Sequence, residues 1–133
     1  MTLRYMLDTN VVSHIMQGRD TALLARLTRV PIGQAVLSSV TLAELEYGLH
    51  RKGNPLRLKN ALFQVLLRMD VLPWDEHVAR CYGAMCHQME TQGINLSDFD
   101  MMIAAHAQAV DLTLVSRDKA FSQLSNGFKL EVW

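Results

Sequence analysis

The chain has 133 residues, of which half are hydrophobic and 20% are charged. This length suits a single domain with a substantial core, residues 1–133, and is too short for two domains. The 13 basic and 13 acidic residues give a formal net charge of zero. That balance excludes a protein whose whole surface attracts nucleic acid, so any such contact must be local.

Short apolar segments alternate with helical patterns along the chain. We expect, in order, a strand at residues 3–7, helices at 11–17 and 21–29, a strand at 35–38, helices at 39–49 and 56–68, a strand at 71–74, helices at 76–91 and 98–109, a strand at 112–116, a helical turn at 118–121 and a strand at 129–133. Strands of this kind, separated by helices, predict a three-layer α/β/α fold with a central, mostly parallel sheet.

Helix ends and inward faces can be assigned from the same pattern. Asp20, Asp75 and Ser97 each precede a helix as N-cap candidates, because their side chains can accept hydrogen bonds from free backbone N–H groups. In the helix at 56–68 we expect the apolar face to point into the core. This face consists of Leu58, Leu62, Val65 and Leu66.

No apolar run approaches the roughly 20 residues of a membrane span, and the first residues do not have the pattern of a secretory signal. The two cysteines, Cys81 and Cys86, would point about 140° apart on a helix, so we do not expect them to pair. Reduced thiols favour a cytoplasmic location.

Four acidic residues occupy similar places in the predicted fold. Asp8 follows the first strand, Glu44 lies in the first turn of the helix after the second, Asp100 begins a late helix, and Asp118 follows the strand at 112–116. Ligands of parallel α/β sheets bind at this edge. Carboxylates gathered there repel one another, and a divalent cation with a preference for oxygen removes that conflict. Such a centre can activate water and stabilise the leaving oxygen of a phosphodiester.

Helix capping is the competing interpretation of these acids. Thr41-x-x-Glu44 and Ser97-x-x-Asp100 both match the capping-box pattern, and Asp8 and Asp118 could cap or form turns. Two further acids, Glu46 and Asp98, lie two residues from Glu44 and Asp100. They would point about 200° away on a helix and should not share the site.

Four segments resemble the motifs of the PIN-domain family, and within it the VapC toxins of bacterial toxin–antitoxin pairs. They are Met6-Leu7-Asp8-Thr9-Asn10-Val11, residues 38–48 around Glu44, residues 100–107 and residues 114–121. The resemblance extends over residues 3–133, and it rests on four motifs in order at the family's spacing.

This resemblance implies an endoribonuclease that depends on Mg²⁺ or Mn²⁺. The catalytic and metal-binding acids of the family fall on Asp8, Glu44, Asp100 and Asp118. The family's serine or threonine before the last acid falls on Ser116, whose hydroxyl would hold Asp8 or a metal-bound water. Thr9 is a further supporting residue, which either caps the first helix or also touches the substrate.

The resemblance also implies partners. The expected substrate is structured RNA, above all tRNA, and the expected inhibitor is a VapB-type antitoxin whose C-terminal segment covers the acidic groove. Homodimers and larger toxin–antitoxin assemblies would bind promoter DNA only through the antitoxin.

A basic stretch without acids runs from Tyr47 to Met69. Its cations are Arg51, Lys52, Arg57, Lys59 and Arg68, with His50 beside them. Arg51 and Lys52 could contact RNA phosphates beside the acidic centre, together with Arg117 and Lys119, which flank Asp118. A solvated helix face explains the stretch equally well.

The sequence is compatible with two other functions. Phosphoryl transfer through Asp8, as in phosphatases of the haloacid-dehalogenase type, is disfavoured because that class has a second Asp where this chain has Asn10. A non-catalytic module could use the acidic groove to bind a basic partner. His77 and Cys81 have the spacing of a zinc pair but no obvious further ligands, and His106 is expected to be packed or exposed rather than a general base.

One further surface could bind a partner. It comprises Met101, Met102, Trp74 and the apolar helix at 56–67, because methionine and tryptophan suit adaptable interfaces.

Overall fold

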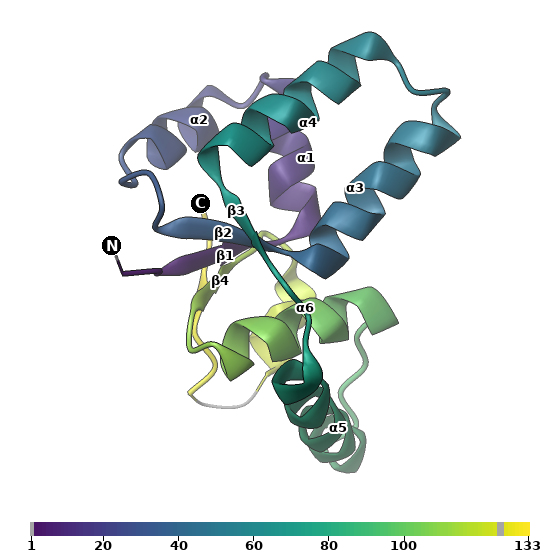
Figure 1. Ribbon diagram of the computed structural model, residues 1–133. Helices are drawn as coiled ribbons and strands as arrows, with labels where there is room; N and C mark the ends of the chain where they lie inside the picture. Colours follow the sequence, from purple (N-terminus) through teal and green to yellow (C-terminus); the bar gives the residue numbers. More distant parts are fainter. Residues whose placement is uncertain (1, 125–126) are drawn as a thin grey trace.

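A computed structural model describes residues 2–124 and 127–133 (Figure 1). Its centre is a five-stranded sheet in the order β3-β2-β1-β4-β5, in which every pair of neighbouring strands is parallel. The strands are β1 (Tyr5–Leu7), β2 (Ala35–Ser38), β3 (Asp70–Leu72), β4 (Thr113–Val115) and β5 (Leu130–Glu131). The predicted parallel sheet is therefore confirmed.

Helices cover both faces of the sheet. They are α1 (Thr9–Gln17), α2 (Thr21–Thr28), α3 (Ser39–Arg51), α4 (Leu56–Arg68), α5 (Glu76–Thr91) and α6 (Asp98–Ala109), followed by the 3₁₀ helix Lys119–Gln123. In Figure 1, α1 to α4 lie on one side of the sheet and α5 and α6 on the other. This arrangement confirms the three-layer α/β/α prediction.

The alternation of side chains along the strands produces two cores. Tyr5 and Leu7 of β1 pack with the layer of α1 to α4, whereas Met6 between them packs with the layer of α5 and α6. All three are almost fully buried, because a parallel strand covered on both faces has no side open to water.

Several predicted boundaries agree with the structure. The ranges of α4, α5, α6 and β2 are the predicted ones, and Asp20, Asp75 and Ser97 all accept a backbone N–H as N-caps.

Other boundaries were wrong by a few residues. Helix α1 begins at Thr9 rather than at Val11, because Asp8 already caps it. Strand β4 starts at Thr113, since the N–H of Leu112 is still bonded to the carbonyl of Ala107 at the end of α6.

Two detailed predictions need correction. Leu66 is not on the inner face of α4: it is 36% exposed, while Leu62 and Val65 are buried. Glu44 is in the second turn of α3 rather than the first, because the helix begins at Ser39 and its N-cap is Ser38.

Within the described part of the chain, no helix is both long enough and apolar enough to cross a membrane.

Candidate active site

The site lies where the order in which strands are added to the sheet reverses. From β1 the chain builds outward to β2 and β3, and it then returns to the other side of β1 for β4 and β5. Leu7 pairs with Val115, and the N–H of Asp8 extends this pairing to the Val115 carbonyl at 3.0 Å. Asp8 and Ser116 therefore leave neighbouring strands together at the switch point, where ligands of open α/β sheets bind.

Asp8 is held by hydrogen bonds to both of its carboxylate oxygens. Oδ1 accepts the N–H of Val11 at 2.9 Å, which caps α1, and Oδ2 accepts the hydroxyl of Ser116 at 2.5 Å. The Ser116 oxygen also accepts the N–H of Asp118 at 3.0 Å. The contact expected between Ser116 and Asp8 is thus present, and it links β1 to the loop after β4.

Burial dominates the electrostatics of Asp8. Only 4% of the residue is exposed, and this desolvation raises its pKa, with further increases from the nearby charges of Asp100 and Asp118. The hydrogen bonds from Ser116 and Val11 act in the opposite direction without cancelling the effect.

Glu44 reaches the same region from α3. The Thr9 hydroxyl donates to Glu44 Oε1 at 2.6 Å, and it lies 3.3 Å from the Thr41 hydroxyl. Burial raises the pKa of Glu44, as do the charges of Asp100 and Asp8, whereas the bond from Thr9 lowers it. Thr41 is fully buried and does not cap the helix, so the capping-box interpretation of Thr41 and Glu44 was wrong.

Asp100 occupies the first turn of α6. Its N–H donates to the Ser97 hydroxyl at 3.2 Å, so Ser97 caps this helix as expected. Burial raises the pKa of Asp100, and so does the charge of Asp118, while a hydrogen bond with Ser97 lowers it. Asp98 is exposed, unlike the half-buried Asp100.

Asp118 completes the group. Its Oδ1 accepts the N–H of Ala120 at 2.9 Å and caps the 3₁₀ helix. Asp118 raises the pKa of both Asp8 and Asp100, which places the three acids within electrostatic reach of one another. The structure therefore brings together all four acids that the sequence singled out.

A divalent cation suits this set of donors. All four side chains offer carboxylate oxygens. Burial raises the pKa values of Asp8, Glu44 and Asp100, and the charges of neighbouring acids raise them further. Across residues 2–124 and 127–133, no group of three or more His, Cys, Asp or Glu side chains is placed so that it could hold a metal ion. An ion that binds one or two carboxylates and keeps several waters or substrate oxygens fits such a centre. The same finding leaves His77 and Cys81 without further zinc ligands.

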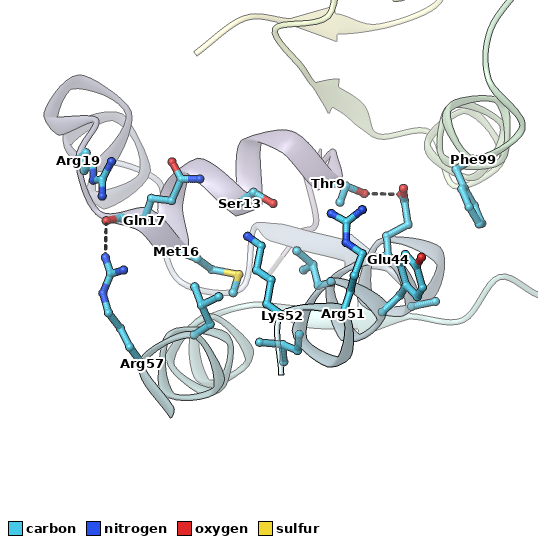
Figure 2. A pocket seen from close by; sticks show the side chains of 16 residues that line it. Thr9, Ser13, Met16, Gln17, Arg19, Glu44, Arg51, Lys52, Arg57 and Phe99 are labelled. Atoms are coloured by element: carbon cyan, nitrogen blue, oxygen red, sulfur yellow. Dashed lines mark hydrogen bonds between the residues drawn. The ribbon is translucent and has the colours of Figure 1, made fainter. Parts of the chain in front are cut away.

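A groove of about 630 Å³ opens beside Glu44, between α1, α3 and α4. We call it the basic groove, because four of its lining residues are Arg19, Arg51, Lys52 and Arg57. Figure 2 shows Arg51 and Lys52 extending toward Thr9 and Ser13 of α1, with Arg19 and Arg57 at the end farther from Glu44. The predicted RNA contacts Arg51 and Lys52 thus lie next to the acidic centre.

The other two predicted RNA contacts differ from each other. The guanidinium of Arg117 pairs with Asp20 at 2.6 Å and donates to the Trp133 carbonyl at 2.8 Å, so it already has partners within the fold. Lys119 is exposed. Both remain predictions.

Two aromatic residues of the groove were not predicted as site residues. Tyr47 and Phe99 are both exposed and both line the groove with Glu44. The spacing of Tyr47, three residues after Glu44, could have placed it on the same helix face. The position of Phe99 depends on how α6 packs against α3.

The fold is an α/β/α domain that carries four carboxylates at the switch point of a parallel sheet, and comparisons with known proteins identify its family. The model of the PIN domain family matches residues 5–127. Ribonuclease VapC2 of Haemophilus influenzae is 31% identical over 131 residues and is covered, like this chain, to 98%. The tRNA(fMet)-specific endonuclease VapC of Shigella flexneri is 30% identical over the same share of both chains.

Solved structures agree with these relatives. The crystal structure of VapBC2 from Rickettsia felis, bound to a DNA fragment from its promoter, contains a chain with 26% identity and a TM-score of 0.91. The match covers 98% of this chain and 99% of that one. This chain therefore belongs to the PIN domain family and, within it, to the VapC ribonucleases.

Proposed function

We propose that this chain is the toxin of a toxin–antitoxin pair and hydrolyses RNA phosphodiester bonds with a divalent cation, Mg²⁺ or Mn²⁺. The observation that carries the proposal is the convergence of four carboxylates at the switch point, three of them with raised pKa values. The negative charges of such a cluster repel the negative charge of a phosphodiester unless a cation lies between the carboxylates and the phosphate. The ribonuclease names of the relatives support the same chemistry.

The four acids would divide the work. Asp8 and Asp100 would hold the cation, and Glu44 and Asp118 would complete its surroundings or orient water. When bound, the cation lowers the pKa of water and stabilises the charge on the leaving oxygen. Ser116 and the N–H of Val11 keep the Asp8 carboxylate in one orientation. Thr9 holds one oxygen of Glu44 and leaves the second available to accept a hydrogen bond from water.

Cleavage of RNA by two matched variants tests this proposal. Asp100→Asn should reduce metal-dependent cleavage by more than about 100-fold, because even outer residues of metal sites are worth about 10–100-fold. Asp98→Asn, two residues earlier on the same helix but exposed, should cleave like the wild type. Full activity of Asp100→Asn, or activity of the wild type in excess chelator, would refute the metal-dependent mechanism. Absence of cleavage by the wild type with metal present would favour a non-catalytic groove.

For the substrate we propose structured RNA, tRNA above all. The Shigella flexneri relative, whose name specifies tRNA(fMet), supports this choice. Mapping of new 5′ ends in total RNA after brief induction of the toxin should show cuts concentrated in one or a few tRNAs. Cuts scattered over messenger and ribosomal RNA would contradict it.

We further propose a VapB-type antitoxin as partner, a homodimer of this chain, and a larger assembly that binds promoter DNA through the antitoxin. The structure of VapBC2 bound to a fragment of its promoter supports the antitoxin partner and the promoter-bound assembly. The free thiols of Cys81 and Cys86 suit a reducing cytoplasm. Co-expression with the neighbouring small gene should yield a complex in which promoter binding requires both proteins. DNA binding by the toxin alone would overturn this part.

A further inference from the structure

Aromatic and basic side chains meet in the basic groove beside the acidic centre. Tyr47 is 65% exposed and Phe99 is 52% exposed, and both line this groove. A single exposed ring is ordinary on a protein surface, but two exposed rings that line one groove beside a charged centre form a patch suited to a contact. Their position therefore calls for a ligand that offers flat, apolar faces.

The two rings flank the acids. Tyr47 lies one helical turn beyond Glu44 on α3, and Phe99 directly precedes Asp100 on α6. Figure 2 shows Phe99 next to Glu44 at one end of the groove, opposite the end that carries Arg19 and Arg57. A ligand that lies in the groove and places a reacting group at the acids therefore passes these rings.

The charges of the groove indicate what kind of ligand this is. Arg19, Arg51, Lys52 and Arg57 line it, and among the described residues none of the four is paired with a carboxylate. Among the lining residues that the structure describes, Glu44 is the only acid. Unneutralised cations along a channel attract a polyanion, and flat rings beside them accept stacked bases.

Arg51 connects the two features. Its guanidinium carbon lies 5.8 Å from the centre of the Tyr47 ring, within the range of a cation–π contact. This contact places the arginine over one face of the ring and leaves the other face without this partner. Arg51 thus supports the ring and adds positive charge next to it.

We propose that Tyr47 and Phe99 are nucleobase-stacking residues that receive unpaired bases of the RNA on either side of the scissile phosphate. The inference rests on the proposed ribonuclease function and adds a reason for preferring single-stranded segments. A paired base presents its faces to its neighbours in the helix and cannot stack on these rings. The cations of the groove would take the phosphates of the same strand.

Binding to a catalytically inactive protein tests this directly. We would measure, by fluorescence anisotropy in the Asp100→Asn background, the affinity for a short labelled oligoadenylate and for an abasic ribose-phosphate oligomer of equal length. Tyr47→Ala and Phe99→Ala should each weaken oligoadenylate binding roughly 5- to 100-fold and leave abasic binding unchanged. Tyr47→Phe and Phe99→Tyr should restore the affinity. Phe63→Ala is the matched control, because Phe63 is 59% exposed on α4 but does not line the groove.

The outcomes are separable from those of the function test. Equal losses for both oligomers, or no loss for either, overturn the stacking proposal even where the wild type cleaves RNA. Unchanged RNA affinity together with weaker binding of the antitoxin would assign the rings to the protein partner and also overturn it. Absence of metal-dependent cleavage by the wild type refutes the proposed function itself.

Discussion

Replacing Asp8 by Asn or by Ala should separate its structural role from its chemical one. Alanine removes the cap of α1 and leaves the buried N–H of Val11 and the hydroxyl of Ser116 without this acceptor. Loss of an N-cap costs about 0.5–2 kcal/mol, and loss of a second buried hydrogen bond about 1 kcal/mol. Removal of a buried charge offsets part of this. We expect Asp8→Ala to lower the free energy of unfolding by about 1–3 kcal/mol.

Asparagine should behave differently because it caps helices as well as aspartate does. Its amide oxygen can accept the N–H of Val11 while its NH₂ group faces Ser116, and it carries no buried charge. Asp8→Asn should therefore be as stable as the metal-free wild type or slightly more stable, and both variants should lose RNA cleavage.

Thermal unfolding in chelator, followed by circular dichroism, measures this difference. At about 3–5 °C per kcal/mol for a domain of this size, Asp8→Ala should melt about 5–10 °C below Asp8→Asn. Equal melting temperatures would refute the argument that the Asp8 carboxylate holds the first turn of α1 as well as serving the site.

Three further predictions concern the surroundings of the site. Thr9→Val should move the acidic limb of the rate–pH profile to higher pH, because the Thr9 hydrogen bond lowers the pKa of Glu44. Thr9→Ser keeps the hydroxyl and should leave the profile in place. An unmoved profile for both variants would contradict the role of this bond. Lys52→Ala should reduce the slope of log RNA affinity against log salt concentration by about one. Lys59 is exposed on α4 and lies outside the groove, so Lys59→Ala should leave this slope unchanged. The same slope for Lys52→Ala and the wild type would indicate a solvated face at Lys52. Burial lowers the pKa of His106, so near this pKa the unfolded chain binds more protons than the folded one. The free energy of unfolding should therefore fall as the pH drops below about 6.5. Urea titrations at several pH values measure this fall, and the same decline in His106→Gln would contradict the assignment to His106.

Most of the helices could be predicted from local signals. Asp75 and Gly93 bracket α5, and Ser97 begins α6, because capping depends on residues that are close in sequence. Strand ends could not be placed as well, because a strand ends where its neighbour stops pairing. The last strand was predicted at residues 129–133, but only Leu130 and Glu131 pair with β4.

The acids of the site could be predicted as a group, whereas their contacts could not. Each of the four lies near the end of a strand or the start of a helix, and the parallel sheet brings those points to one edge. The bond from Thr9 to Glu44 depends on the packing of α1 against α3, and the presence of Phe99 in the groove depends on the packing of α6. Neither packing arrangement has a signature within a short stretch of sequence.

Capping and catalysis are not alternatives at Asp8. Each carboxylate oxygen has two lone pairs, and in Asp8 one pair on each oxygen is used by Val11 or Ser116. The same two bonds that cap α1 and link it to the loop after β4 fix the carboxylate in one orientation, with the remaining lone pairs free for a cation. Glu44 illustrates the opposite case. It lies one turn inside α3, where it has no backbone N–H to cap, and among the described residues its side-chain hydrogen bond is the one from Thr9. Asp8 should therefore be the more rigid of the two, and Glu44 the one that adjusts when substrate and water enter.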